Sequence, residues 1–433
     1  MSLARKGLRV FATNWGVFLV RFVAGVVIVR LLGAEGRGTV VILTLGVGLL
    51  ATVGQFGLPN AAAFLLGKER FGFASLLAAF LVWTVLFSAV VAAGVFAARD
   101  FVWRTFFEGV ALSPDLLMLT GLWLPATMAG NFVGYLHLSA GRTAAYAWQT
   151  LGVGLAGAGS TIVVVTFFGG GVTGAIWCAV LAQVLIAGAA TVAGLRRGSW
   201  RAPGIWAQLL PLGAQNFAGT VGALVFKRLD NFILAYFWGP AAVGYYSVGS
   251  MANESLLSIP RSIGGLLTGK ASSQDGAAAA VSVARATQAV FWILLACALG
   301  LIAGAPWVVP FIYGADFTAA VVPVQILAVS AVCLGTTIAL NPYFIGVGRA
   351  LLTSTLLLAG GAVATAAAFA WVPAHGPTGS AWAALAGSAV LLLLTVRAFG
   401  RLSGVGAGAL FGWPRAEFAR IRDRVRDKFK GSR

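Results

Sequence analysis

The feature that most constrains this chain is a succession of apolar runs, each about 20 residues long, separated by short breaks. About 20 apolar residues in a helix cross the ~30 Å hydrocarbon core of a bilayer. Only 10% of the residues are charged and 59% are hydrophobic, against about 25% and 45–50% in a typical soluble domain. The short alternating segments of a membrane β-barrel do not occur. The sequence therefore predicts an all-α polytopic membrane protein.

The apolar runs and the breaks between them predict twelve membrane-spanning helices, with ends placed to within about four residues. No loop between the spans is long enough to form a soluble domain. The expected spans are 11–32, 39–66, 74–97, 116–138, 146–168, 172–194, 207–237, 242–268, 287–309, 320–341, 350–371 and 378–400.

Lysine and arginine are distributed unevenly along the chain, which has a net charge of +18. With the N-terminus in the cytoplasm, the inner segments hold most of the 30 Lys and Arg, and the outer loops hold only Arg37, Arg99 and Arg104. Cytoplasmic loops of membrane proteins carry such an excess. We therefore expect a multi-pass membrane protein with both termini in the cytoplasm. Because topology explains the charge, nucleic-acid binding is not expected.

The segment 403–433 differs from the rest of the chain because it is strongly basic. Phe418, Ile421, Val425 and Phe429 recur on one helical face, with Arg and Lys on the other. This pattern predicts a cytoplasmic tail that lies on the anionic inner leaflet. A solvated charged tail is the alternative.

The two halves of the chain share residues at a nearly constant spacing. The matching positions are Arg21 with Lys227, Gly33 with Gly239, Gly38 with Gly244, and Gly141–Arg142 with Gly348–Arg349. An even number of helices separates the copies, so both halves have the same orientation in the membrane. We expect two six-helix lobes, 1–200 and 201–402, related by a pseudo-twofold axis along the membrane normal around a central cavity.

Several polar residues fall inside the predicted spans, where a charge costs about 3 kcal/mol to insert and so generally faces a cavity or a partner. Surplus positive charge from Arg21, Lys227 and Arg228 would suit an anion such as a diphosphate. The other polar residues expected in the cavity are Asn14, Asn216, Asp230, Asn231 and Glu254. The alternative is a structural network in which the basic residues pair with the two carboxylates.

No pattern in the sequence indicates catalysis. It lacks a Walker A loop, and no metal-ligand neighbour lies beside His137 or His375. The three cysteines fall inside apolar runs, too few for a zinc site or a disulfide framework. We therefore expect neither an enzyme nor a bound cofactor or metal.

The chain resembles the polysaccharide-biosynthesis flippases, the lipid-linked oligosaccharide branch of the multidrug/oligosaccharidyl-lipid/polysaccharide (MOP) exporter superfamily. The resemblance covers about residues 5–400 and rests on loose motifs, which are Arg21…Arg30-Leu-Leu-Gly33…Gly38, Gln55-Phe-Gly-Leu58 and Lys227-Arg-Leu-Asp-Asn-Phe-Ile-Leu234.

This resemblance implies a two-lobe fold and transfer of an undecaprenyl-diphosphate-linked oligosaccharide to the outer leaflet by alternating access. By position, Arg21, Lys227 and Arg228 would hold the diphosphate. Glycosyltransferases or a polymerase of the same pathway would be partners, besides membrane lipids. The alternatives are a cation-coupled multidrug exporter of the MATE type, whose cavity should be acidic or aromatic, and a membrane scaffold that transports nothing.

The predicted topology places residue 198 in the cytoplasm. A Gly198→Cys variant should therefore resist a membrane-impermeant maleimide in intact cells and react after permeabilisation, whereas Ser113→Cys, in the predicted outer loop Arg99–Pro114, should react in intact cells. Labelling of position 198 from outside would overturn the topology.

Overall fold

A computed structural model describes residues 3–107, 114–272 and 276–412. Nearly all side chains of residues 3–24 and 218–228, and most of 263–272, lie outside that description. The described residues form α-helices and two short 3₁₀ helices, with no strand. Eight described stretches are long and apolar enough to cross a membrane. The all-α membrane class predicted from the sequence is thus confirmed.

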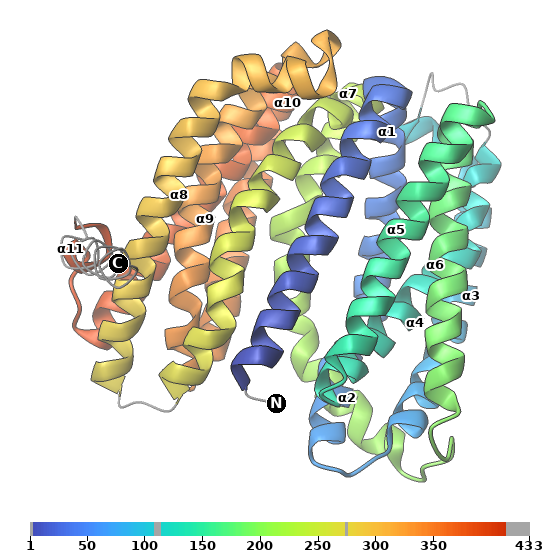
Figure 1. The fold of residues 1–433 in the computed structure, drawn as a ribbon, viewed down its shortest axis with the longest axis horizontal. Coiled ribbons are helices and arrows are strands. Elements are labelled where there is room, and N and C mark those ends of the chain that lie inside the picture. The colour runs from blue at the N-terminus through green and yellow to red at the C-terminus, as the bar shows by residue number, and fades with distance from the viewer. Residues whose placement is uncertain (1–2, 108–113, 273–275, 413–433) are drawn as a thin grey trace, which may run out of the picture.

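The second half of the chain repeats the element order of the first in part: it has no short helix after its first long helix, and one kinked helix follows where the first half has two (Figure 1). The first series is α1 Leu3–Gly54, α2 Leu58–Gly67, α3 Phe73–Phe106, η1 Pro114–Leu119, α4 Thr120–Ser139, α5 Thr143–Phe167 and α6 Gly171–Leu195. The second is α7 Ile205–Ser272, α8 Gly276–Tyr313, η2 Ala315–Ala320, α9 Val321–Gly346 and α10 Ala350–Ser403, followed by the short α11 Gly408–Phe411.

Three helices are much longer than a membrane span because each continues through a single non-helical glycine. These glycines are Gly33 in α1, Gly239 in α7 and Gly376 in α10, with φ of 67°, 71° and 53°. Only glycine adopts such φ values without steric cost. The breaks expected at Gly33–Gly38, Gly239–Pro240 and Pro373–Pro377 therefore shrink to sharp kinks. The division of the chain into twelve spans stays a prediction.

The expected span 39–66 is itself interrupted. The helix that follows Gly33 ends at Gly54, and α2 begins only at Leu58. Phe56 and Gly57, between them, both have positive φ, at 46° and 69°. This interruption differs from the expected continuous span, although Gly54, Gln55, Gly57 and Pro59 all lie at the break.

The kinked helices α1 and α7 meet through two glycines that the sequence had paired. A Cβ on Gly38 would collide with the carbonyl oxygen of Pro240, and a Cβ on Gly244 would collide with that of Ala34. The two contacts are reciprocal, since each half presents its glycine to the other half's backbone. Such an exchange is typical of a twofold interface.

The turns after α4 and α9 also agree in detail. Gly141 and Gly348 have φ of 70° and 73°. The next backbone amide donates to the carbonyl five residues earlier in both turns, Arg142 to His137 at 2.8 Å and Arg349 to Phe344 at 2.7 Å. These matches support the predicted internal repeat, while the lobe boundaries at 1–200 and 201–402 stay a prediction.

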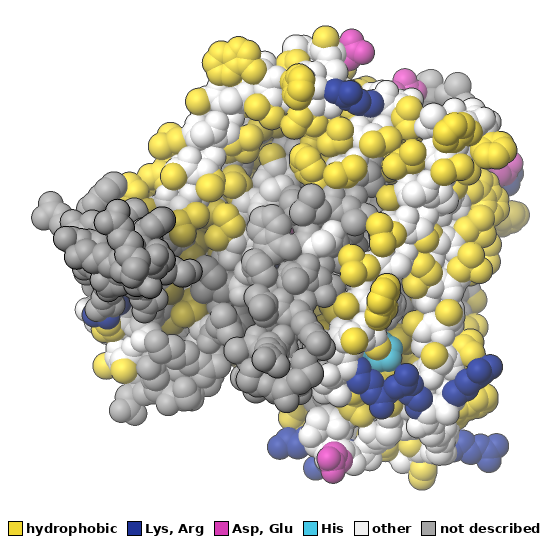
Figure 2. All heavy atoms as spheres, in the orientation of Figure 1, with side chains coloured by type: hydrophobic (Ala, Val, Ile, Leu, Met, Phe, Trp, Pro, Cys, Tyr) yellow, Lys and Arg dark blue, Asp and Glu magenta, His cyan; other side chains and the backbone are white. Residues whose placement is uncertain are grey.

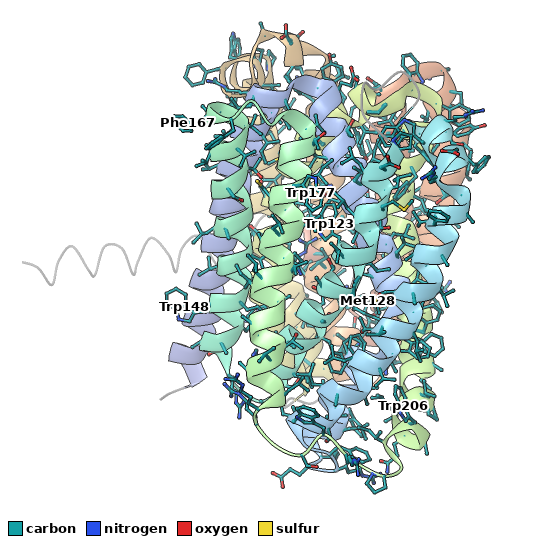
Figure 3. All side chains as sticks on the ribbon, turned by 90° about the vertical axis from the view of Figure 1, so that its right-hand side faces the viewer. Trp123, Met128, Trp148, Phe167, Trp177 and Trp206 are labelled. Carbon is teal, nitrogen blue, oxygen red and sulfur yellow. The ribbon has the colours of Figure 1, made fainter. Side chains whose placement is uncertain are left out.

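Large apolar side chains serve both the interior and the outer surface. Met128 and Trp123 are buried inside the bundle, whereas Trp148 and Phe167 are 78% and 77% exposed and project outward from α5 (Figure 3). Inside, the rings of Phe80 and Phe132 stack with centroids 3.8 Å apart. Exposed aromatic side chains on the outer surface fit contact with lipid.

Basic residues gather at one end of the N-terminal series, the lower edge in Figure 2. There the Arg142 guanidinium lies over the Phe73 ring, 5.4 Å from its centroid, and Arg70 donates to Gln208 Oε1 at 3.1 Å. These contacts bring together loops that the sequence places on the cytoplasmic side. The cytoplasmic location of the termini stays a prediction, and the expected amphipathic face at Phe418–Phe429 lies outside the described residues.

We predict that the reciprocal glycine contact is essential for stability. Gly38→Ala and Gly244→Ala should each cost about 1–3 kcal/mol, because the added methyl meets backbone that cannot rotate away. Gly46→Ala on the same helix is the control, since no atom lies within 4 Å of its Cβ position, and alanine favours helix by about 1 kcal/mol. The midpoint of thermal unfolding of the purified protein should fall for the first two variants only. Equal midpoints in all three would contradict the prediction.

Candidate functional site

A cavity of about 1000 Å³ lies between α1, α4–α6, α7, α9 and α10. Its lining runs from Arg37 and Ser247, beside the Gly38–Gly244 contact, to Arg261 and Ser262 further along α7. The close backbone approach therefore lies at one end of the cavity. A volume of this size is at the upper end of the range found for small-molecule sites.

One wall of the cavity, from α4, α5 and α6, is polar but uncharged. Its hydrogen-bonding side chains are Asn131, Tyr135, Tyr146, Gln149 and Gln183. Gln149 Nε2 donates to the Gly130 carbonyl at 2.7 Å, and Gln183 Nε2 lies 3.4 Å from the Ala126 carbonyl. Both amides thus bridge to α4, which fixes their orientation and leaves their carbonyl oxygens as acceptors.

The α7 wall carries a carboxylate with several donors. Asp230 Oδ1 accepts hydrogen bonds at 2.8 Å from both the backbone amide and Nδ2 of Asn231. Its Oδ2 accepts from the hydroxyl of Tyr246, which is buried. Hydrogen bonds to a carboxylate stabilise its charged form. Asp230 is therefore held in place by three hydrogen bonds from Asn231 and Tyr246.

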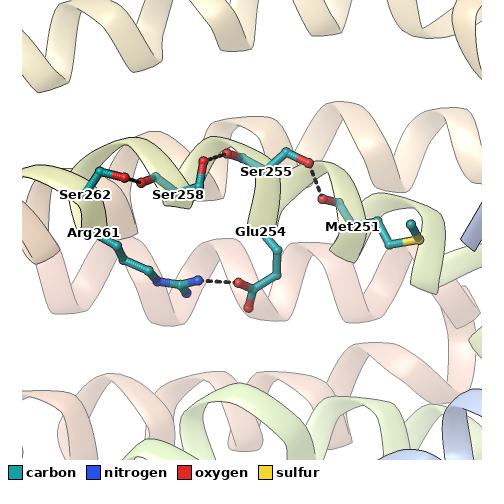
Figure 4. A network of polar contacts seen from close by, with 6 residues as sticks. All are labelled: Met251, Glu254, Ser255, Ser258, Arg261 and Ser262. Atoms are coloured by element: carbon teal, nitrogen blue, oxygen red, sulfur yellow. Dashed lines mark hydrogen bonds and ion pairs between the residues drawn. The ribbon is translucent and has the colours of Figure 1, made fainter. Parts of the chain in front are cut away.

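A second carboxylate on α7 forms an ion pair inside the cavity. Glu254 accepts a hydrogen bond from Arg261, two helical turns away (Figure 4). The two side chains are 47% and 40% exposed, so the pair contributes at most about 1 kcal/mol. The hydroxyls beside it, Ser255, Ser258 and Ser262, donate to carbonyls of their own helix. The pair therefore faces the open cavity without further cross-links from these serines.

Arg37 lies in the cavity, and its expected place in an outer loop is wrong. Because the helix bends at Gly33 alone, Arg37 falls on the first turns of the second segment of α1. Its guanidinium contacts Ser247 Oγ at 3.4 Å and Met251 Sδ at 3.5 Å. Within the described part of the chain, no carboxylate lies within 4.0 Å of it. The described hydrogen-bond partners of Arg37 in the cavity are thus both neutral.

The structure brings together some of the residues expected at the site. Asp230, Asn231 and Glu254 line the cavity. Asn216 does not line it: this residue is exposed, and its Nδ2 donates to the Leu212 carbonyl of the preceding turn at 2.7 Å. The side chains of the remaining expected residues, Asn14, Arg21, Lys227 and Arg228, lie outside the described residues.

Sequence reasoning missed Arg37, Arg261 and the amides of α4–α6. Arg37 had one usable signal in the repeat. Its neighbour Gly38 matches Gly244, which lies inside the expected span 242–268, so Gly38 and Arg37 would also be expected in a helix. The amides had none, since single Asn and Gln residues in apolar runs resemble ordinary interhelical hydrogen-bonding residues.

The sequence profile of the family described as "Polysaccharide biosynthesis protein" matches residues 27–322. The chain belongs to this family. No match was found among curated proteins.

Solved structures share the fold of this polysaccharide biosynthesis protein at low sequence identity. Lipid II flippase MurJ in an inward closed conformation is 13% identical over 90% of each chain, with a TM-score of 0.72. An outward-facing MATE multidrug transporter of the MOP superfamily is 16% identical over 93% of this chain and 95% of its own, with a TM-score of 0.63. The bent form of VcmN, the MATE transporter of Vibrio cholerae, is 14% identical over 93% and 98%, with a TM-score of 0.62.

The family assigns the chain to polysaccharide biosynthesis, and its fold is shared with the lipid II flippase and with MATE transporters. The predicted family is thus confirmed. The fold admits both the flippase and the multidrug exporter, so the substrate must be argued from the cavity.

We predict that the Tyr246 hydroxyl stabilises the fold through Asp230. Tyr246→Phe should lower stability by about 1.5–3 kcal/mol, the usual contribution of a hydrogen bond to a charged group. Tyr313→Phe is the control, because Tyr313 is also buried but its hydroxyl has no hydrogen-bond partner among the described residues. Thermal unfolding of the two purified variants measures the difference, and equal midpoints would show that the Asp230 contact contributes nothing.

Proposed function

We propose that this protein moves an undecaprenyl-diphosphate-linked oligosaccharide from the inner to the outer leaflet of the cytoplasmic membrane by alternating access. Family membership supports a role in polysaccharide synthesis. The single observation that carries the proposal further is Arg37, which lines the cavity and forms no ion pair with a carboxylate among the described residues.

Burying a guanidinium whose described hydrogen-bond partners are the neutral Ser247 and Met251 costs free energy unless a ligand supplies negative charge. A diphosphate suits it, because the planar fork of arginine matches two phosphate oxygens at once. Arg21, Lys227 and Arg228 would add to this site, since their positions along α1 and α7 correspond in the two halves. Surplus positive charge at the site is part of the proposal.

The two cavity carboxylates fit this assignment because both are already engaged. Asp230 accepts from Tyr246 and Asn231, and Glu254 is paired with Arg261. A cationic substrate would have to displace these partners, whereas an anionic head group would not.

The uncharged wall of α4–α6 supports a glycan as the rest of the substrate. Amide and phenol groups, such as those of Asn131, Gln149 and Tyr135, are suited to hydrogen-bond sugar hydroxyls. A diphosphate near α1 and α7 and a glycan along the opposite wall would together use both kinds of surface.

The second candidate is a cation-coupled multidrug exporter, favoured by the likeness to MATE transporters and by the presence of Asp230 and Glu254 in the cavity. It predicts that deletion of the gene sensitises cells to cationic drugs and leaves surface polysaccharide intact. The flippase proposal predicts the reverse, with lipid-linked glycan accumulating on the inner leaflet.

Arginine substitutions test the anion site itself. Arg21→Ala and Arg37→Ala should each abolish or strongly weaken glycan export in a deletion strain, while Arg21→Lys keeps part of it because the charge survives without the bidentate fork. Arg99→Ala is the control, because Arg99 pairs with exposed Asp115 away from the cavity. Surface glycan and thermal stability are measured in parallel.

The stability measurement separates a transport role from a structural one. If Arg21 only balances a buried carboxylate, Arg21→Ala leaves that charge unpaired and the protein unfolds more easily. If Arg21 and Arg37 bind substrate, both alanine variants remain folded and fail to export. Normal export by well-expressed alanine variants would refute the anion site.

A further inference from the structure

We infer that a side pocket at the break between α1 and α2 binds one uncharged sugar ring of the transported glycan, several units along from the diphosphate. The pocket has a volume of about 280 Å³ and adjoins the central cavity, since Asn131 and Tyr135 line both. This inference rests on the proposed function, because it assumes that the substrate carries a glycan.

The break that forms the pocket is locally strained. Phe56 has a φ of 46°, a conformation that costs a bulky residue about 1–3 kcal/mol. Three contacts hold it: the Phe56 ring lies 4.8 Å from that of Phe217, Trp83 Nε1 donates to the Gly54 carbonyl at 2.6 Å, and Gly57 lies so close to the Gly213 carbonyl that a Cβ would collide. Strain maintained by this many contacts commonly marks a functional site.

The break creates a polar recess between α1 and α2. Below it in Figure 1, α2 continues toward the end of the bundle. The pocket is lined by Thr52, Gln55, Gly57, Pro59, Asn60, Asn131 and Tyr135. Broken transmembrane helices line substrate sites in other transporters, because non-helical backbone at membrane depth is tolerated only in such places.

Gln55 gives the direct indication of a ligand. Its Nε2 is buried and has no hydrogen-bond partner among the described residues, although Gln55 belongs to a pocket wall. An unpaired buried donor costs about 1–3 kcal/mol. A hydroxyl of a bound ring would satisfy it after a small rotation of the amide, and Asn60 and Asn131 offer further donors and acceptors.

The charge and size of the pocket select its occupant. None of the described residues that line it is charged, so neither a metal cation nor an acidic sugar finds a counter-charge. Its volume lies just below the roughly 300 Å³ at which drug-sized sites begin, which suits one ring and excludes an oligosaccharide. A neutral hexose or N-acetylhexosamine fits both limits.

The position of the pocket decides which ring it receives. Arg37 and Thr52 lie on the same continuous helical segment, and the intervening residues, at 1.5 Å each, separate them by about 22 Å. A diphosphate at Arg37 therefore leaves the pocket within reach of a ring several units further along the glycan, not of the first sugar.

Binding of free sugars tests the pocket apart from the lipid. The full-length protein in nanodiscs is titrated with glucose, galactose, mannose, N-acetylglucosamine and glucuronate, and binding is followed by saturation-transfer NMR. We expect at least one neutral sugar to bind and glucuronate not to bind. Gln55→Leu should raise the Kd of that neutral sugar at least tenfold, because the shape survives while the amide is lost.

Two further variants make the test decisive. Gln325→Leu is the matched control, since Gln325 donates to the Ile302 carbonyl and lines neither cavity; its sugar binding should be unchanged. Asn60→Ala replaces Gln55→Leu if the latter does not fold, because Asn60 is exposed in the pocket. Absence of neutral-sugar binding in the wild type, or an unchanged Kd in the pocket variant that folds, overturns the inference.

Undecaprenyl diphosphate is titrated against the same samples to separate the two proposals. If it binds and no sugar does, the pocket is refuted and the proposed function stands. If a neutral sugar binds in a Gln55-dependent way but the diphosphate does not bind, the proposed function fails and the pocket remains.

Discussion

The close approach of α1 and α7 at Gly38 and Gly244 is the contact around which the rest of the molecule is arranged. In a bilayer, helices gain little from hydrophobic burial, because lipid tails are as apolar as their side chains. Helix association then depends on close packing of backbone against backbone, which only glycine permits because it has no side chain. At this point the two halves touch, and the kinks at Gly33 and Gly239 lie beside it. The cavity begins where this contact ends.

The lining of the cavity is asymmetric, although the helices around it partly repeat. Its charged groups lie on α1 and α7, where Arg37, Asp230 and the Glu254–Arg261 pair face the cavity. The wall from α4–α6 has amides and phenols instead. This division gives the cavity an ionic side and a neutral side, as a substrate with a charged head and an uncharged body would require.

The sequence predicted the helical class, the family and the glycines of the central contact, because apolar length and repeated residues are directly readable. It placed Arg37 in an outer loop, because an arginine between two glycines after an apolar run resembles a loop residue. In the structure the helix bends at Gly33 alone and then continues, so Arg37 is helical. The positive φ of Phe56 could not be predicted, because phenylalanine has no preference for it, although Gly54, Gly57 and Pro59 mark a possible break. That conformation depends on Trp83, Gly213 and Phe217, which lie on other helices. Asn216 shows a similar limit, because helical periodicity places residues on a common face without saying which neighbour that face meets.

The reciprocity of the glycine contact also bears on the origin of the protein. Each half carries both members of the contact, a glycine and the carbonyl that receives it: Ala34 and Gly38 in one, Pro240 and Gly244 in the other. An ancestral chain of half this length would have been self-complementary and could have formed this contact as a homodimer. In a single chain that holds both members, each can change without altering the other. The helix break at Phe56 and the ion pair of Glu254 with Arg261 occur in different halves, as expected if the copies diverged while the contact between them was kept.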